Sequence, residues 1–288
     1  MAKIDKSQFS KKEWKQIREQ RRRQKELQAK NSHTVKTVKE NYSEAPQLES
    51  AAHNSKNYIV CLKHGAKYDA KYVNTLYNMI SRNCTVPHEF VCFTENSEGL
   101  DQNITVKPLP SIPRASGWWY KPMFFAPNFE LKGTILYFDL DVIIFKNIDN
   151  LFSYSPKRFC ILKDFNRSIR SSWKKFNSSV FRLESGAIPH VYNDFIADPA
   201  SAIRRFHGDQ DWIFDRVREG FEYWPDEWIQ SYKWEMRGRP AMVRDRSGKR
   251  NFGSPGEPKI LPNTSVAVFH GEPNPHDCID PWCKRNWK

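Results

Sequence analysis

Two aspartates interrupt one of the most apolar stretches of the sequence. Asp139 and Asp141 lie in the segment Tyr137-Phe-Asp-Leu-Asp-Val-Ile-Ile144. Burying an ionised carboxylate without a partner is costly, so a cation has to compensate. Because side chains two positions apart in an extended segment face the same side, the pair can bind one Mg²⁺ or Mn²⁺, which can in turn hold a diphosphate. The alternative interpretation is that one acid caps a helix and the other pairs with a Lys or Arg.

The elements that must position this pair have the pattern of an α/β domain. The apolar run over 133–138 predicts a strand that leads directly into Asp139. We expect earlier strands over 58–62, 88–93 and 104–109, with helices over 69–82 and 118–126. This alternation predicts a mostly parallel central sheet flanked by helices. The two acids then lie at the carboxyl end of a strand, where α/β proteins bind ligands.

The second half of the chain is less regular. We expect strands over 158–163, 178–183 and 266–269 and helices over 189–197 and 208–219. The segment 237–263 is rich in Gly, Pro, Arg and Asn and is predicted to be a long loop.

The acidic segment resembles the DxD motif of GT-A nucleotide-sugar glycosyltransferases, particularly the glycogenin-like group. The resemblance covers about residues 57–275 and includes four further stretches in the family's order. These are Trp119-Tyr-Lys-Pro-Met-Phe124, Phe176-Asn-Ser-Ser-Val180, Gly208-Asp-Gln-Asp-Trp212 and Val268-Phe-His-Gly271. The resemblance implies a GT-A (Rossmann-like) fold and transfer of a sugar from a nucleotide-sugar donor.

The resemblance also implies a metal site and a donor site. Asp139, Asp141 and His270 are the expected ligands of Mn²⁺ or Mg²⁺, and an imidazole ligand favours Mn²⁺. Lys121, Asp139 and Trp119 are expected to bind the donor. The alternatives are a surface position for Lys121, a core position for Trp119 and a structural role for His270.

The expected catalytic residues are Asn177, beside the donor sugar, and Asp209, Gln210 and Asp211, facing the sugar and acceptor. In the alternative interpretation, Asp209 or Asp211 caps the helix that is expected over 208–219. The chain departs from the family after His270, where Glu-Pro-Asn-Pro follows Gly271 in place of a segment with a phosphate-binding Lys.

The implied reaction is transfer of a hexosyl or pentosyl group, with retention, from a nucleoside-diphosphate sugar to an acceptor hydroxyl. A UDP-sugar is the expected donor, and the acceptor is a glycan, a lipid or modified DNA. The alternatives are a haloacid-dehalogenase-like phosphatase, which also uses a DxD strand, and a non-enzymatic nucleic-acid-binding protein. A further alternative is a zinc site formed by His270, His276, Cys278 and Cys283, although their spacing fits no standard zinc pattern.

The first 45 residues carry +7 of the chain's net charge of +13, with thirteen Lys and Arg against six Asp and Glu. We predict a basic, partly helical extension and linker over 1–55 and a glycosyltransferase domain over 56–288. Arg21, Arg22 and Arg23 are the expected centre of contact with nucleic acid or an acidic surface. The alternative is a solvated extension without a partner.

The sequence shows no run of about eighteen apolar residues and no apolar segment near its start. We therefore expect no transmembrane segment and a cytoplasmic location. The six cysteines lack the regular spacing of a disulfide scaffold and are expected to be reduced thiols.

Overall fold

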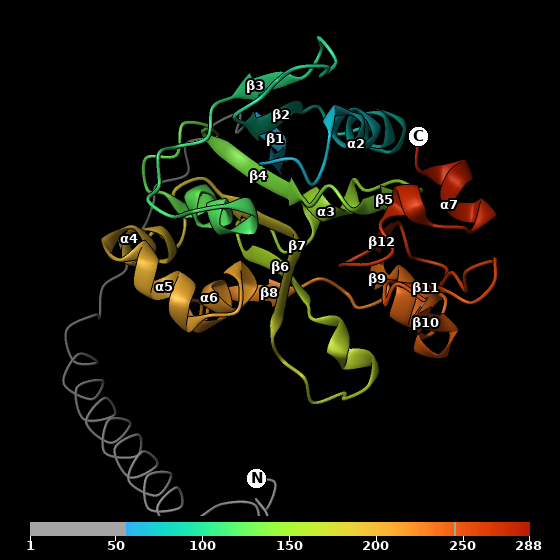
Figure 1. The fold of residues 1–288 in the computed structure, drawn as a ribbon. Coiled ribbons are helices and arrows are strands. Elements are labelled where there is room, and N and C mark those ends of the chain that lie inside the picture. The colour runs from blue at the N-terminus through green and yellow to red at the C-terminus, as the bar shows by residue number, and fades with distance from the viewer. Residues whose placement is uncertain (1–55, 245) are drawn as a thin grey trace, which may run out of the picture. The chain divides into compact units, whose positions relative to one another are not determined.

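A seven-stranded sheet organises the part of the chain that the computed structural model describes, residues 56–244 and 246–288 (Figure 1). Its strand order is β3-β2-β1-β4-β7-β6-β8. All neighbouring strands are parallel except the two pairings made by β7, so the predicted mostly parallel sheet is confirmed. The strands are β1 (Lys56–Lys63), β2 (Glu89–Thr94), β3 (Thr105–Lys107), β4 (Gly133–Phe138), β6 (Phe159–Lys163), β7 (Phe176–Glu184) and β8 (Phe221–Tyr223).

Two smaller sheets adjoin this one. The first has the order β5-β12-β9, formed by Val142–Ile144, Val266–Val268 and Ile229–Ser231. The second is the hairpin of β10 (Met242–Arg244) and β11 (Arg250–Phe252). This hairpin corrects the prediction of a long loop over 237–263. Its strands have three residues each and no run of apolar side chains, so periodicity cannot reveal them.

Helices cover both faces of the main sheet. In Figure 1, α2 lies on one side of the sheet, whereas α4, α5 and α6 gather on the other. The α-helices are α2 (Ala70–Asn83), α3 (Asn150–Ser153), α4 (His190–Ala197), α5 (Pro199–Arg205), α6 (Asp209–Arg216) and α7 (Pro281–Asn286). The other helical segments are the 3₁₀ segments η2 (Gly117–Phe125), η3 (Phe165–Ser168), η5 (Arg239–Ala241) and η6 (Pro275–Asp277), and the π-helical turn η4 (Tyr232–Met236).

The apolar run of β1 is explained by burial on both faces. Ile59 and Cys61 belong to a core cluster with Leu76 of α2. Val60 and Leu62 belong to a separate cluster, which includes side chains of η2, α4 and α6. Because successive side chains of a strand point to opposite faces, a strand covered on both sides has to be apolar throughout.

Backbone hydrogen bonds fix the segment between β4 and β5 that carries the two acids. The Asp139 N–H donates to the Ser179 carbonyl at 2.8 Å, which ties the segment to β7. The Phe269 N–H donates to the Asp141 carbonyl at 2.9 Å, which brings the residues after β12 beside it. Segments separated by well over a hundred residues therefore meet at the carboxyl end of β4.

Several further predictions concern the chain as a whole. All six cysteines are free, as expected. Among the described residues, no helix has the length and apolarity needed to cross a bilayer. The predicted extension over 1–55, with Arg21, Arg22 and Arg23, lies outside the described residues, and its boundary with the domain over 56–288 stays a prediction.

Candidate functional site

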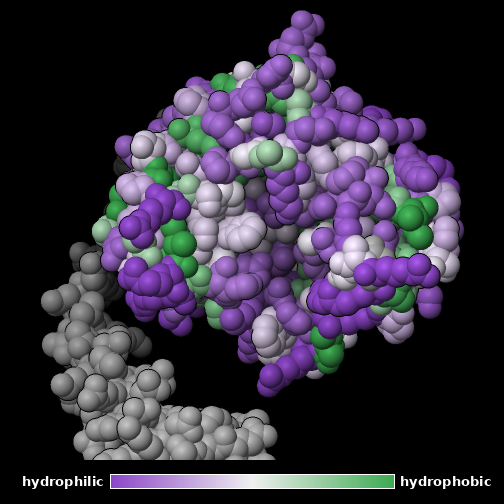
Figure 2. Space-filling view, in the orientation of Figure 1, coloured by the Kyte–Doolittle hydropathy of each residue, from purple (hydrophilic) through white to green (hydrophobic). Residues whose placement is uncertain are grey.

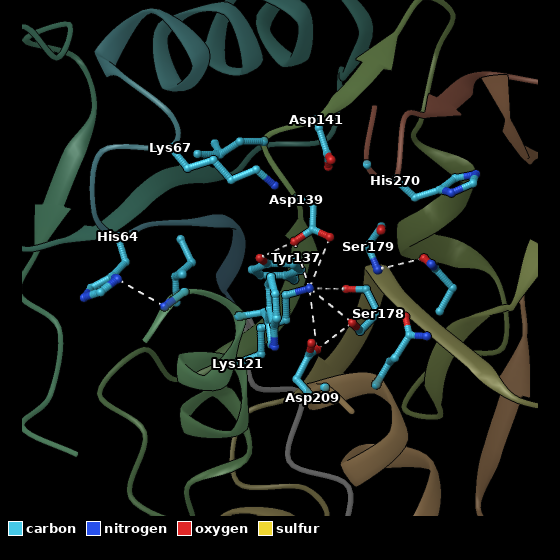
Figure 3. Close-up of a pocket in the computed structure, with 18 of the residues that line it drawn as sticks. His64, Lys67, Lys121, Tyr137, Asp139, Asp141, Ser178, Ser179, Asp209 and His270 are labelled. Carbon is cyan, nitrogen blue, oxygen red and sulfur yellow. Dashed lines mark hydrogen bonds and ion pairs between the residues drawn. The ribbon is translucent and has the colours of Figure 1, made fainter. Parts of the chain in front are cut away.

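A cleft of about 480 Å³ opens at the carboxyl ends of β1 and β4. It is visible as a hollow near the centre of the face in Figure 2, and Figure 3 shows side chains converging on it. Asp139 and Asp141 both line this cleft. The other predicted site residues along it are Lys121, Asn177, Asp209, Gln210 and His270.

Lys121 joins two acids at the bottom of the cleft (Figure 3). Its Nζ lies 2.8 Å from Asp139 Oδ1 and 3.5 Å from Asp209 Oδ2, and it donates to Ser178 Oγ at 3.1 Å. Lys121 is only 3% exposed, which excludes the alternative of a surface position. Burial lowers the pKa of Lys121, but the carboxylates of Asp139 and Asp209 outweigh burial, so the net pKa is raised. The ammonium therefore stays charged and orders both acids.

Asp141 has no such direct partner, although Lys67 and Lys233 lie near enough to lower its pKa in part. It is 7% exposed, accepts a hydrogen bond from the Tyr68 hydroxyl at 3.1 Å, and forms no ion pair among the described residues. Burial and the nearby Asp139 carboxylate raise the pKa of Asp141. A divalent cation in the cleft would remove both destabilising effects, and carboxylate oxygens are the ligands that Mg²⁺ and Mn²⁺ prefer. The chemistry of the two acids therefore fits a metal.

His270 lies at the edge of the same cleft. Its Nε2 is 2.6 Å from Ser231 Oγ, its ring stacks on Phe165, and Figure 3 shows the imidazole turned away from the two acids. Burial, together with Lys233 and Arg239, lowers the pKa of His270 to about 3. The imidazole is therefore neutral at pH 7, the form in which histidine binds metals.

The ligand atoms of Asp139, Asp141 and His270 do not converge as the side chains stand. Among the described residues, the one group of three ligand atoms lying within 4.8 Å of one another belongs to Cys278, Asp280 and Cys283. His270 and His276 are not part of this group, so the alternative zinc site is not assembled.

The carboxylate of Asp280 has partners of its own. It is fully buried, forms an ion pair with Arg237, and accepts a hydrogen bond from the Tyr232 hydroxyl at 2.9 Å. Because this charge is already neutralised, we interpret the group of Cys278, Asp280 and Cys283 as part of the core.

The predicted catalytic residues separate into two groups. Asn177, Asp209 and Gln210 line the cleft, and Asp209 accepts a hydrogen bond of 2.5 Å from the Ser178 hydroxyl. Asp211 does not line it and instead pairs with Lys175 at 2.8 Å. Neither acid caps α6 with its side chain, because Gly208 is the N-cap residue. The structure therefore brings Asp209 and Gln210, but not Asp211, to the other site residues.

The adjacent tryptophans also differ. Trp119 is 6% exposed and stacks on Phe195 in the core, with ring centroids 5.7 Å apart, so the structure does not bring this predicted donor-binding residue to the cleft. Trp118 is 51% exposed and lines the cleft beside Gly208. In a 3₁₀ segment, neighbouring side chains point in different directions, so only one of the pair can face the core.

Replacing these two tryptophans by alanine should give opposite results. Trp118→Ala should lower kcat/KM about tenfold with little change in stability, because an exposed aromatic wall of a binding cleft is lost. Trp119→Ala should lower the free energy of unfolding by about 3–5 kcal/mol, because it leaves a cavity in the core. Urea denaturation and steady-state kinetics on both variants test this. Equal losses of stability would contradict the assignment.

Sequence reasoning missed the loop after β1, which contributes three residues to the cleft. His64, Lys67 and Tyr68 follow β1, and Lys67 extends toward the two acids in Figure 3. The signal was present in the sequence, because parallel neighbouring strands end at the same edge of a sheet. Residues that follow the first predicted strand should therefore meet those that follow the strand over 133–138.

Comparisons with known proteins rest on structure alone. No protein-family model matches the chain, and no curated protein matches it in sequence. An active-site mutant of LgtC is similar in structure, with a TM-score of 0.56 and 13% identity over 79% of this chain and 93% of that one. The galactosyltransferase LgtC with donor and acceptor sugar analogues gives a TM-score of 0.53 and 14% identity over the same shares.

The glycosyltransferase GlyE of Streptococcus pneumoniae TIGR4 gives a TM-score of 0.58 and 13% identity over 81% of this chain and 60% of that one. At such identities the likeness shows the fold. The chain has a GT-A-type α/β fold, which confirms the predicted fold class.

Proposed function

We propose that the chain is a metal-dependent glycosyltransferase that uses a nucleoside-diphosphate sugar as donor. The observation that carries the proposal is the position of Asp139 and Asp141 in one cleft of a GT-A-type fold, with Asp141 buried and in no ion pair among the described residues. The similar structures include the glycosyltransferase GlyE and the galactosyltransferase LgtC, the latter with donor and acceptor sugar analogues.

Asp139 and Asp141 would hold Mn²⁺ or Mg²⁺, with His270 as a third ligand after its ring turns toward them. When bound, the metal supplies positive charge beside the diphosphate of the donor. Lys121 lies 2.8 Å from Asp139 and so restricts the orientations of the carboxylate that would hold the metal. Its bonds to two acids also make Lys121 a positioning residue in this proposal, and not the phosphate contact that the resemblance implies.

In the transfer, the acceptor oxygen bonds to the anomeric carbon while the bond from that carbon to the diphosphate breaks. The diphosphate keeps the electron pair and takes the proton that the acceptor hydroxyl loses. Asp209 and Gln210, both on the cleft, would hold hydroxyl groups of the transferred sugar, and Asn177 would lie beside it. The family resemblance further suggests a UDP-sugar as donor, a hexosyl or pentosyl group as the transferred sugar, and retention of the anomeric configuration. These three points are part of the proposal.

Lys67 is our candidate for the phosphate-binding cation that the segment after Gly271 lacks. It lines the cleft and forms no ion pair among the described residues. Asn274, in that segment, lies 3.5 Å from the Tyr68 hydroxyl next to it. The two segments therefore meet, and a cation on one can replace a cation missing from the other.

Lys67→Met should weaken binding of UDP with Mn²⁺ about tenfold, because one charge-assisted contact to phosphate is lost. Stability should stay within about 0.5 kcal/mol, as is usual for an exposed side chain, and no hydrogen bond or ion pair joins Lys67 to another described residue. Calorimetric titration measures the affinity of the wild type and of Lys67→Met for UDP with Mn²⁺. Lys132→Met, on an exposed position outside the cleft, is the control and should bind UDP like the wild type. Unchanged binding by Lys67→Met would remove the assignment.

The proposed activity is tested by incubating the full chain with a panel of nucleotide sugars. Release of a nucleoside diphosphate with Mn²⁺ or Mg²⁺, abolished by EDTA, is the expected result. Hydrolysis of simple phosphomonoesters without turnover of any nucleotide sugar would favour the haloacid-dehalogenase-like alternative and contradict the proposal.

A further inference from the structure

A second cavity, of about 340 Å³, lies beside the cleft and is lined by basic side chains. We call it the basic pocket. Glu272 is the one acid among the described residues that line it, and its carboxylate accepts a hydrogen bond from the Arg250 backbone N–H. Four basic side chains line the pocket: Lys233 of η4, Arg239 of η5, Arg244 of β10 and Arg250 of β11. Burial lowers the pKa of Lys233 to about 7, so the three arginines carry most of the charge.

The strand pairing places two of these cations opposite each other. Arg244 and Arg250 are direct partners in the antiparallel β10–β11 ladder. Like charges directly opposite in such a ladder are destabilising. An anion between them would attract both guanidinium groups and offset their repulsion, so the hairpin favours a negatively charged ligand.

Arg239 carries the clearest unused binding capacity. Its guanidinium lies over the Trp234 ring, 3.5 Å from the centroid. The Nε and one Nη of Arg239 are buried and have no hydrogen-bond partner among the described residues. Leaving buried donors unsatisfied costs about 1–3 kcal/mol each. The fork of a guanidinium matches the oxygens of a phosphate, and a phosphate would satisfy these donors once the guanidinium turns toward the pocket.

Lys233 closes the inner end of the pocket. It is 2% exposed, and its ammonium donates to the backbone carbonyls of His270 and Glu272, both at 2.8 Å. An ammonium has three N–H groups, so one remains for a ligand. No carboxylate lies within ion-pair distance of Lys233 among the described residues.

The basic pocket and the cleft share His270 and Gly271. A molecule with an anionic group in the basic pocket can therefore extend a neighbouring hydroxyl past these residues toward the two acids. In the proposed function, the donor diphosphate binds beside Asp139, Asp141 and Lys67, outside the basic pocket. The positive charge of the basic pocket is therefore available to bind the acceptor.

We propose that the basic pocket binds a phosphate group carried by the acceptor and so selects a phosphorylated glycan or polyol, an inference that rests on the proposed function. The volume of the pocket suits one phosphate group with an adjoining sugar or polyol unit. In this arrangement Arg239, Arg250 and Lys233 hold the phosphate, and the hydroxyl that receives the sugar lies a few atoms away.

The test uses the full chain and four probes in calorimetric titrations at low ionic strength. Inorganic phosphate and glucose 6-phosphate represent the anionic acceptor, glucose is the neutral match, and UDP with Mn²⁺ reports the donor site. Both phosphates should bind and glucose should not. Arg239→Gln and Arg250→Gln should each weaken phosphate binding about tenfold, because each removes a charge-assisted contact. Both variants should bind UDP within twofold of the wild type.

Arg204→Gln is the matched control, since it removes the same charge from the exposed end of α5, which lies far from β10 and β11 in Figure 1. Its phosphate affinity should equal that of the wild type. Arg250 is exposed, so its variant stays informative if Arg239→Gln fails to fold.

Each outcome separates the two proposals. Unchanged phosphate affinity in Arg239→Gln and Arg250→Gln would overturn the phosphate subsite, even if UDP binds. A parallel loss of UDP affinity would also overturn it, because the pocket would then serve the donor. Absence of UDP binding to the wild type, with phosphate binding intact, would instead count against the proposed glycosyltransferase function.

Discussion

Replacing Asp141 by Asn is expected to lower kcat of sugar transfer by about 10³-fold, the size of effect seen when a group that stabilises transition-state charge is removed. Asparagine keeps the volume and can still accept the hydrogen bond from Tyr68. It lacks the charge that, in our account, holds the metal. Because the buried carboxylate carries a desolvation penalty, the same change should leave the free energy of unfolding unchanged or raise it in the absence of metal.

The measurement is steady-state kinetics over a series of Mn²⁺ concentrations, with urea denaturation of the same preparations. Asp194→Asn is the control, because Asp194 lies on α4, about half exposed, and pairs with Arg216. It should leave kcat within about twofold, as expected of a surface position outside the cleft. Full activity of Asp141→Asn with unchanged dependence on Mn²⁺ would refute the assigned role.

Lys121→Met should lower kcat about 10²- to 10³-fold and also destabilise the protein by about 3–5 kcal/mol. The ammonium is the one cation within 4 Å of both Asp139 and Asp209 among the described residues. Without it, two carboxylates remain close together at the bottom of the cleft. Both their position and their ionisation should then change.

The double variant Lys121→Met with Asp209→Asn distinguishes folding from catalysis. Removing the second charge should recover part of the lost stability, since one unpaired buried carboxylate is gone. Activity should stay low, because the group that orders Asp139 is still absent. Recovery of activity in the double variant would mean that Lys121 acts only through stability.

Tyr137→Phe removes a single 2.7 Å hydrogen bond to Asp139 and should lower the free energy of unfolding by about 1 kcal/mol.

The parts of the fold that the sequence predicts are those where burial dictates residue type. The strand over 133–138 is buried along nearly its whole length and the helix over 69–82 along one face, so their apolar patterns are strong. The hairpin of β10 and β11 is mostly exposed or half-buried, and no apolar pattern reveals it. Its basic pocket depends on tertiary pairing of Arg244 with Arg250, which no local pattern contains.

The difference between local patterns and tertiary contacts also explains which residues of the candidate site the sequence predicts. Asp139 and Asp141 are visible in the sequence because charged residues stand out in an apolar run. Lys67 follows a strand in an ordinary polar loop and carries no comparable local signal. The choice between Trp118 and Trp119 depends on which ring η2 turns toward α4, so it requires coordinates.

The most direct test of the account is a thermal-denaturation titration of UDP with and without Mn²⁺. Because ligand and metal would share Asp139 and Asp141, each should raise the affinity for the other. We predict that UDP raises the Tm of the wild type several-fold more with Mn²⁺ than without it, and that Asp141→Asn loses this difference. The account would be contradicted if no nucleoside diphosphate stabilised the wild type, or if stabilisation were the same without metal and in Asp141→Asn.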